Sequence, residues 1–353
     1  MKKIPRNLIE FIRSKKKVNL SSYIDFCLFN RKNGYYQTQK SVGKDFITSP
    51  EVNQIFGECI SIFLVYISQM IGCTQKKTLI ELGPGNGTLA YDILSSLKKL
   101  NVHNKWYYNL FEKSDRLRMI QKKKFGNDFK DNLKWIKNFK TKHDGPHFFI
   151  CNEFFDALPI DQYKKENCRF KKKKIFINPL NKLSSDYFNT KKKIQNYYKR
   201  MSNGDVVEVS EKMEKIIHKL FKVIKKKQGL VILFDYGPLN KKNIDTIQGI
   251  NNGKKCDILY APCNSDITHH VDFNYLKSIA YEYNLDVKGP ITQRDFLFSM
   301  GAKERMSILF DKGKNVEQQR ELLSSFKRLT DKDKMGELFK CIIFHTNKYK
   351  MPF

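Results

Sequence analysis

The pattern of apolar and polar residues predicts short buried strands that alternate with amphipathic helices along most of the chain. Residues 78–82 form an apolar run typical of a buried parallel strand, and leucine and isoleucine then recur at helical spacing over residues 89–97. Strands are also expected at 106–111, 133–136, 147–151, 205–209, 230–234 and 340–345. Alternating strands and helices are typical of an α/β fold with a mostly parallel sheet.

Residues 1–75 are predicted to form an N-terminal helical segment, with a helix that starts at Pro50, is capped by Ser49 and runs through Ile67. Residues 45–51 carry turn residues together with aromatic and polar groups, so we expect them to act as a lid over the active site.

Residues 76–353 are predicted to form the core, with insertions at about 160–205 and 238–268. In the first insertion, residues 161–176 alternate enough to form a basic hairpin, whereas 178–200 are expected to be an exposed loop with a short helix. The second insertion is expected to be a loop.

The loop after the first of these strands carries Gly83, Gly85 and Gly87, and Glu81 comes just before it. Glycines have no Cβ, so backbone N–H groups at the start of the next helix can approach a ligand and bond its polar groups. The spacing differs from the Gly-x-Gly-x-x-Gly fingerprint of dinucleotide sites, and no Gly-Lys-Ser/Thr of a phosphate loop follows. The segment predicts a nucleotide pocket, although glycine clusters also form ordinary turns.

Acidic and amide side chains follow two further strands. Glu112 ends the strand at 106–111, where a carboxylate can accept hydrogen bonds from both hydroxyls of a ribose. Asn152, Glu153 and Asp156 follow the strand at 147–151, beside two phenylalanines. Ligands of open α/β sheets bind beyond the carboxyl ends of the strands, so we expect these groups to line the same crevice as the glycine loop.

The net charge of +30 would suit a nucleic acid or an anionic membrane surface. The lysines, however, lie in short runs scattered along the whole chain, which favours solvated faces over a binding stripe. The eight cysteines show no Cys-x-x-Cys spacing and several lie in apolar runs, as in a reducing compartment.

Neither a secretory signal nor a membrane span is expected. Residues 1–13 lack the apolar segment of a signal, and the longest apolar run, 59–72, is interrupted by polar residues and is short for a bilayer. His269 and His270 are adjacent and have no acidic or cysteine partner at ligand spacing, so no metal is expected. We expect a soluble, cytoplasmic protein without stable membrane insertion.

Seven motifs occur together in one order, at residues 34–36, 45–51, 81–89, 152–159, 235–237, 270–273 and 289–293. The glycine loop resembles motif I of class I S-adenosylmethionine (SAM) methyltransferases. The whole set closely resembles the MidA-like family of SAM-dependent methyltransferases, whose mitochondrial members are complex I assembly factors. The resemblance implies a class I, Rossmann-like sheet, SAM as cofactor and arginine methylation of a complex I core subunit. It also implies a bacterial cytoplasmic protein, or a mitochondrial matrix protein if the chain is eukaryotic.

In this interpretation the cofactor is bound by residues of the glycine loop and of the strand ends, namely Glu81, Gly83, Gly85, Gly87, Glu112 and Asn152. A guanidinium stays protonated at neutral pH and presents a planar fork of donors, which suits two carboxylates. Glu153 and Asp156 are the catalytic candidates, and Asn152 is expected to accept a hydrogen bond from the cofactor or the acceptor nitrogen.

Two alternatives remain open. A methyltransferase acting on RNA or another anionic substrate would account for the positive charge, but no basic patch interleaved with aromatic residues stands out. A SAM-binding assembly factor without turnover would carry the same motifs. We therefore expect a protein substrate and do not expect nucleic acid.

Overall fold

The structure is a computed structural model that describes residues 4–38, 47–139, 143–167, 169–190, 201–240, 242–346 and 350–353. The chain divides into two compact units. The sheet unit comprises Ile47–Phe154, His218–Leu239 and Asp272–Phe353, and the insertion unit comprises Met1–Phe46, Phe155–Ile217 and Asn240–Val271. The N-terminal residues thus group with both inserted segments rather than with the helix that precedes the glycine loop.

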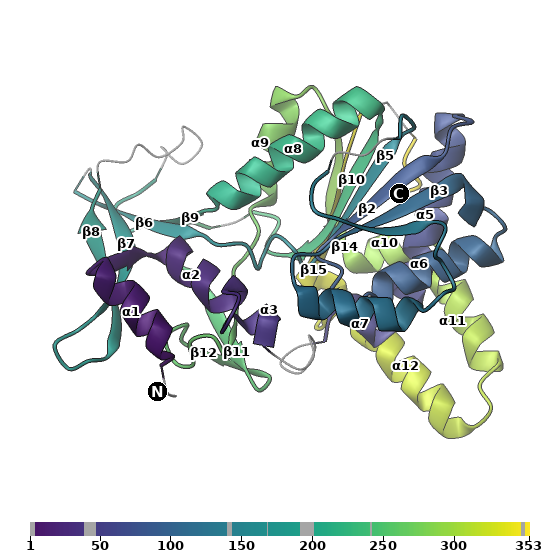
Figure 1. The fold of residues 1–353 in the computed structure, drawn as a ribbon. Coiled ribbons are helices and arrows are strands. Elements are labelled where there is room, and N and C mark those ends of the chain that lie inside the picture. Colours follow the sequence, from purple (N-terminus) through teal and green to yellow (C-terminus); the bar gives the residue numbers. More distant parts are fainter. Residues whose placement is uncertain are drawn as a thin grey trace. The chain divides into compact units, whose positions relative to one another are not determined.

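The sheet unit contains a seven-stranded sheet in the order β14-β15-β10-β5-β2-β3-β4 (Figure 1). The five strands from β10 to β4 are parallel, and β15 pairs antiparallel with both β10 and β14. This mixed sheet confirms the predicted Rossmann-like α/β fold. The strands are β2 (Lys77–Leu82), β3 (Trp106–Phe111), β4 (Leu133–Ile136), β5 (His147–Asn152), β10 (Gly229–Tyr236), β14 (Asp286–Thr292) and β15 (Phe339–His345).

Helices cover both faces of this sheet. Alternate residues of each strand point to opposite faces, and one face forms a continuous apolar core with helices that include α5, α6, α7 and α10. Phe221 of α8 packs on Phe344 of β15, on the other face. The helices are α5 (Ile55–Ile71), α6 (Thr88–Lys99), α7 (Asp115–Phe125), α8 (Glu211–Lys227), α9 (Phe273–Glu282) and α10 (Gln293–Ser299).

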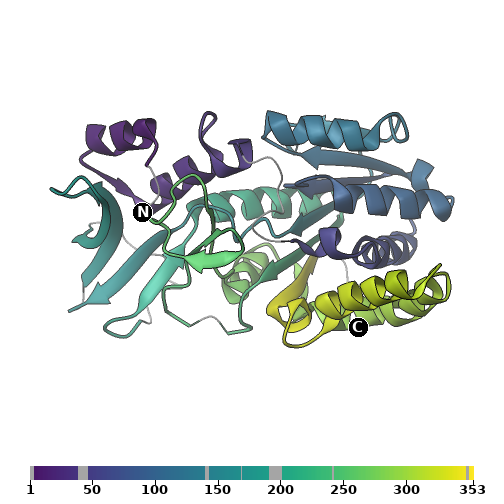
Figure 2. The same ribbon diagram turned by 90° about the horizontal axis from the view of Figure 1, so that it is seen from below.

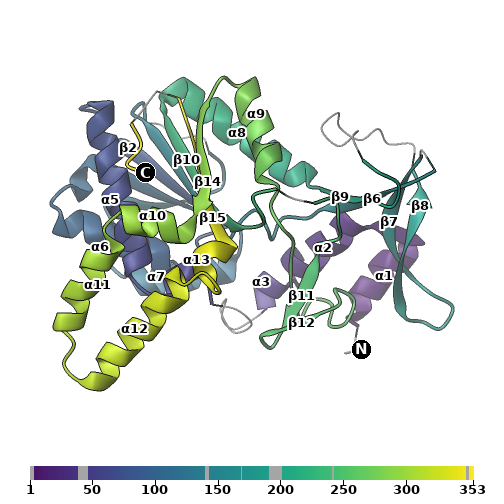
Figure 3. The ribbon, with the colours of Figure 1, turned by 180° about the vertical axis from the view of Figure 1, so that it is seen from behind.

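A helical segment separates the last two strands of the sheet in sequence. It contains α10, α11 (Ala302–Asp311), α12 (Val316–Thr330) and α13 (Met335–Leu338). Helices α11 and α12 lie side by side (Figures 2 and 3). Gln293 of α10 donates a hydrogen bond to the carbonyl of Leu329 in α12, so the segment is tied to the end of the sheet.

One helix was predicted from Pro50 to Ile67, but the structure contains two. Helix α4 (Ser49–Val52) ends at Asn53, whose backbone is extended, and α5 begins at Ile55. The side chain of Asn53 accepts a hydrogen bond from the backbone N–H of Ile55, which satisfies a donor at the start of the new helix. The expected cap at Ser49 is also wrong, because its hydroxyl bonds to Gln293 instead.

The insertion unit contains a five-stranded sheet built on the predicted basic hairpin. Its strands are β1 (Lys17–Asn19), β6 (Asp161–Glu166), β7 (Arg169–Ile177), β8 (Leu183–Asn189) and β9 (Val206–Val209). Strand β8 corrects the predicted loop at 178–200, because Leu183–Asn189 pairs with β7 along its whole length. Residues 191–200 lie outside the described residues. Helices α1 (Arg6–Ser14), α2 (Leu20–Phe29) and α3 (Tyr35–Thr38) belong to the same unit.

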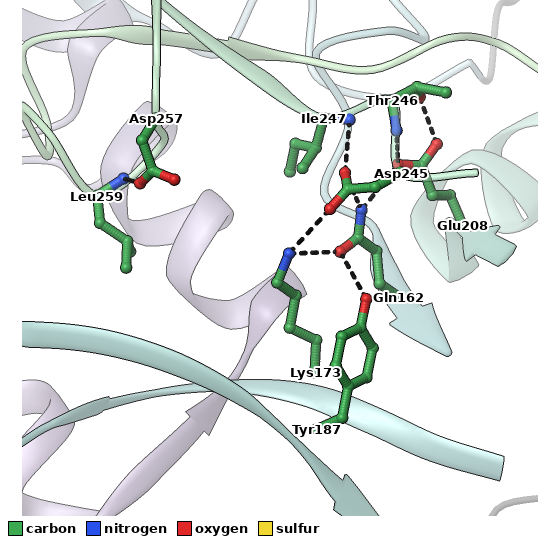
Figure 4. A network of polar contacts seen from close by, with 9 residues as sticks. All are labelled: Gln162, Lys173, Tyr187, Glu208, Asp245, Thr246, Ile247, Asp257 and Leu259. Carbon is green, nitrogen blue, oxygen red and sulfur yellow. Dashed lines mark hydrogen bonds and ion pairs between the residues drawn. The ribbon is translucent and has the colours of Figure 1, made fainter. Parts of the chain in front are cut away.

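The second insertion was expected to be a loop, but it forms a three-stranded antiparallel sheet of β11 (Gln248–Asn251), β12 (Lys254–Cys256) and β13 (Asp266–Thr268). A polar cluster joins this segment to the five-stranded sheet of the same unit (Figure 4). Buried Glu208 accepts hydrogen bonds from Gln162 and from the backbone and hydroxyl of Thr246, and Lys173 bridges Gln162 to Asp245. Since the polar groups of this cluster bond one another, we assign it a structural role.

Candidate functional site

Strands β3, β2, β5 and β10 are parallel neighbours, so their carboxyl ends meet at one edge of the sheet. Leu82 at the end of β2 lies beside Phe111 of β3 and Cys151 of β5, and Phe234 of β10 lies beside Asn152. The residues that follow these positions therefore come together. The structure brings the glycine loop, Glu112, Asn152 and Glu153 to one edge, and their binding of a ligand there stays a prediction.

The glycine loop has a backbone that requires glycine. Gly83, Gly85 and Gly87 have φ values of 65°, 53° and 79°, in the left-handed region that other residues rarely adopt. A Cβ at Gly83 would lie only 2.7 Å from Cδ2 of Phe154, and one at Gly87 would lie 3.1 Å from Cε2 of Phe125. The rings of Phe154 and Phe125 therefore leave little room for a side chain at Gly83 or Gly87.

Glu112 is buried at the end of β3, and its Oε1 accepts a hydrogen bond of 2.7 Å from the backbone N–H of Ser114. Burial raises the pKa of Glu112 to about 7, and hydrogen bonds from the backbone of Ser114 and Lys113 and from Gln121 act in the opposite direction. This carboxyl group is thus balanced between its charged and neutral forms near neutral pH.

Glu81 is also buried, but it lies within β2 rather than beyond it. Its Oε2 accepts a hydrogen bond of 2.6 Å from the hydroxyl of Tyr108 on the neighbouring strand. Burial raises the pKa of Glu81 to about 7. The contact with Tyr108 fixes the carboxyl group beneath the glycine loop.

Glu153 is held in an unusual conformation at the end of β5. Its φ is 47°, which is a strained backbone for a residue with a side chain. Its Oε1 accepts a 3.1 Å hydrogen bond from the backbone N–H of Ser49 and a 3.3 Å one from the side-chain amide of Asn152. The Oδ1 atom of Asn152 is buried and accepts no hydrogen bond from the part of the chain that the structure describes, so a donor on a ligand would satisfy it.

Helix α4 contacts both the glycine loop and Glu153. Oε1 of Glu51 accepts hydrogen bonds of 2.7 Å from Thr88 and 3.3 Å from Asn86, while Ser49 bonds Glu153. The hydroxyl of Ser49, which is buried, donates to Gln293 at 2.9 Å. Residues 45 and 46 of the predicted lid lie outside the described residues. The described part of this lid thus contacts both the glycine-loop region and Glu153.

Asp156 belongs to the insertion unit, whereas Asn152 and Glu153 belong to the sheet unit. Within its own unit Asp156 is buried, and its carbonyl accepts a hydrogen bond from the backbone N–H of His269. The hydroxyl of Tyr36 bonds Asp266 at 2.8 Å, and the charges of Asp266 and Asp156 both raise the pKa of this tyrosine, although burial is the larger cause. Asp156 and Asp266 therefore lie near one tyrosine hydroxyl.

Three further residues of the sheet unit belong to this region but were not among the predicted site residues. Asp235 is fully buried at the end of β10, next to β5. Gln293 receives the hydroxyl of Ser49, and Gln121 bonds the carbonyl of Gly85. Asp235 and Gln293 lie in two of the seven motifs but were given no role, whereas Gln121 lies in none, and a glutamine within a helix resembles any solvated polar residue.

Within the described ranges, no group of three or more histidine, cysteine or acidic side chains could hold a metal ion. None of the helices in the described part of the chain is both long and apolar enough to cross a membrane.

Comparison with known proteins identifies the family. The family model of S-adenosyl-L-methionine-dependent methyltransferases matches residues 59–291. Protein arginine methyltransferase NDUFAF7, mitochondrial, of Xenopus tropicalis is 31% identical over 361 residues, which cover 95% of this chain and 84% of the relative. The human protein of the same name is 30% identical over 364 residues, covering 95% and 81%.

Solved structures confirm the fold. The crystal structure of a superfamily member from Burkholderia thailandensis, bound to S-adenosyl-homocysteine, has a TM-score of 0.82 with this chain at 20% identity, and covers 96% of this chain and 91% of that one. The family match spans most of the chain and the named relatives span nearly all of it. The protein therefore belongs to the MidA-like family of methyltransferases, and its cofactor is S-adenosyl-L-methionine.

Proposed function

We propose that this methyltransferase transfers the methyl group to an arginine side chain of a protein, and that the substrate is a core subunit of respiratory complex I during assembly. The observation that carries the proposal is identity of 30% or more, over nearly the whole chain, to relatives named protein arginine methyltransferase. Both relatives are named as mitochondrial proteins. We therefore propose the mitochondrial matrix as the compartment in a eukaryote, and the cytoplasm in a bacterium.

The residues at the sheet edge fit SAM. The positive φ values of the glycine loop allow its backbone to come close to the amino-acid part of the cofactor, and the N–H groups of Gly83 and Gly87 hold the turn by bonding the carbonyls of Phe111 and Pro84. Glu112 is a buried acceptor suited to the two ribose hydroxyls, and Oδ1 of Asn152 is a buried acceptor for a ligand donor. Glu81, fixed by Tyr108, supports the loop from within the sheet.

SAM supplies an activated methyl group on a sulfonium, and the protein contributes orientation and exclusion of water. Glu153 is proposed to hold the guanidinium of the acceptor, because a carboxylate accepts bidentate hydrogen bonds from its planar donor fork. Ser49 and Asn152 both donate hydrogen bonds to Oε1 of this carboxylate and so fix its orientation. Asp156, three positions further along the chain, is proposed as the second acidic partner of the arginine.

The charge of the two carboxylates also favours one class of substrate. Glu153 and Asp156 are negatively charged when ionised, so they attract a cation and repel the phosphates of RNA. The positive surface charge alone does not distinguish a protein substrate from a nucleic acid.

The proposal is tested by incubating the enzyme with methyl-labelled SAM and a lysate of a strain that lacks it. We expect the label in a protein fraction, lost after protease and retained after nuclease. Label that disappears with nuclease would favour an RNA methyltransferase, and SAM binding without any label would favour an assembly factor without turnover.

A further inference from the structure

Gln121 on α7 links three parts of the cofactor region, although no motif includes it. The side chain is fully buried, and its Nε2 donates a hydrogen bond of 2.7 Å to the carbonyl of Gly85. Its Oε1 accepts a hydrogen bond of 2.8 Å from the indole N–H of Trp135 on β4. The same side chain lies near Glu112 and acts to lower the pKa of its carboxyl group. Gln121 thus connects the glycine loop to the edge strand and lies beside the acid after β3.

The orientation of this amide is fixed by its partners. An indole N–H can only donate and a backbone carbonyl can only accept, so Oε1 must face Trp135 and Nε2 must face Gly85. The second hydrogen of Nε2 is then available to Glu112. No other uncharged side chain of this length supplies two donors and one acceptor in this arrangement, and a glutamate would place a second negative charge beside Glu112.

The aliphatic part of the Gln121 side chain also accounts for the glycine at position 87 of the loop. A Cβ at Gly87 would lie 3.2 Å from Cγ of Gln121, which is closer than ordinary packing allows. The glycine loop and Gln121 therefore fit each other both in shape and in hydrogen bonding.

We propose that Gln121 is a positioning residue for the cofactor, which holds the carboxyl group of Glu112 and the carbonyl of Gly85 in the arrangement that recognises the ribose hydroxyls. The inference rests on the proposed role of Glu112 in cofactor binding. It adds that recognition of the ribose depends on a residue that itself need not touch the cofactor.

The test uses binding rather than turnover. Calorimetry with the full chain compares S-adenosylhomocysteine with its 2′-deoxyribose analogue, in the wild type and in Gln121→Met, which keeps the length of the side chain without its polar atoms. One lost hydrogen bond to a charged group weakens binding by about tenfold to a hundredfold, so the wild type should prefer S-adenosylhomocysteine by that ratio. In Gln121→Met the preference should shrink at least about threefold, because Glu112 is no longer held in place.

Two further variants separate positioning from a general loss of structure. Gln162→Met removes an equally buried, hydrogen-bonded amide from the insertion unit, and it should lower the melting temperature without changing the preference. Trp135→Phe removes the indole donor that orients Gln121 and keeps a smaller aromatic ring in its place, so its preference should fall between those of the wild type and Gln121→Met. If Gln121→Met does not fold, Trp135→Phe alone must still reduce the preference.

The outcomes distinguish this inference from the function on which it rests. A wild type that binds both compounds equally would overturn the ribose role of Glu112. A wild type that discriminates, together with folded Gln121→Met and Trp135→Phe proteins that discriminate equally well, would overturn the role of Gln121 alone.

Discussion

The backbone N–H of Ser49 donates a 3.1 Å hydrogen bond to Oε1 of Glu153, although the two residues are 104 positions apart in sequence. Ser49 is the first residue of α4, where backbone N–H groups have no partner within the helix. Glu153 supplies that partner while its own backbone is in the left-handed region. A catalytic candidate is thus positioned by the segment that was predicted to cover the site.

Replacing Glu153 by glutamine keeps an oxygen that can accept from Ser49 and Asn152 but removes the negative charge. The fold and SAM affinity should therefore remain nearly unchanged, whereas methyl transfer should fall by about a hundredfold or more, since the charge acts mainly in the transition state. Calorimetry and single-turnover labelling measure the two effects. A Glu153→Gln enzyme with wild-type turnover would remove this residue from the mechanism.

Gly83→Ala tests the shape of the cofactor loop, and the chain offers a matched control in Gly72→Ala. Both glycines have nearly the same positive φ, 65° and 63°, so both substitutions should cost about 1–2 kcal/mol of unfolding free energy. Only at Gly83 would the new Cβ lie 2.7 Å from Phe154, whereas nothing lies within 4 Å at Gly72. S-adenosylhomocysteine affinity should fall about tenfold or more in Gly83→Ala alone. Equal affinities in the two variants would contradict the assignment of the loop.

The pKa of Glu112 predicts how cofactor binding depends on pH. Because the free carboxyl group has a pKa of about 7 and ionised Glu112 is the better acceptor for ribose, affinity should rise with pH through about 7 and then level off. Binding should release a proton, which calorimetry in buffers of different ionisation enthalpy detects. Arg116 and Arg118 lie near this carboxyl group, and the charge of Arg118 acts to lower the pKa of Glu112.

Glu112→Gln is the control for this dependence. Glu81 and Asp92 also have pKa values raised to about 7, so a dependence that persists in Glu112→Gln would assign the titration to one of these two groups. The stability of the folded protein should change with pH in the opposite direction to the cofactor affinity. The folded protein binds more protons than the unfolded chain between about pH 4.5 and 7, so the unfolding free energy should decrease as pH rises through that window, and less steeply in the variant.

Glu51→Ala removes the hydrogen bonds that α4 makes to Asn86 and Thr88. These bonds are exposed, so the loss of affinity for S-adenosylhomocysteine should be only about threefold. Hydrogen exchange of residues 47–52 is the more sensitive readout. We expect the ligand to slow exchange there in the wild type and to have less effect in Glu51→Ala; exchange that is unchanged by ligand in the wild type would refute the lid.

The parts of the fold that could be predicted are those encoded by local periodicity. Six strands of the main sheet follow from apolar runs in the sequence, and Gly83, Glu112 and Asn152 were named because they stand at the ends of three of these runs. Strand β14 was not predicted. Strand β8 was missed because Leu183–Asn189 is short and rich in polar residues, and it becomes a strand only by pairing with β7.

The relationships between distant residues could not be read from sequence. Nothing in the charged helix 115–125 marks Gln121, whose role depends on Gly85 and Trp135 from other elements. The break at Asn53 was hidden because Pro50 and the following apolar residues fit one continuous helix. Such features depend on tertiary contacts, which local patterns do not encode.

The position of the transferred methyl group tests directly whether this enzyme methylates a protein arginine. Purified enzyme, methyl-labelled SAM and a purified complex I subcomplex should give a labelled subunit, and tandem mass spectrometry of its peptides should place the added methyl on an arginine guanidinium nitrogen. The label should be absent with Glu153→Gln. Label on lysine, on a cysteine or on co-purified RNA would contradict the account.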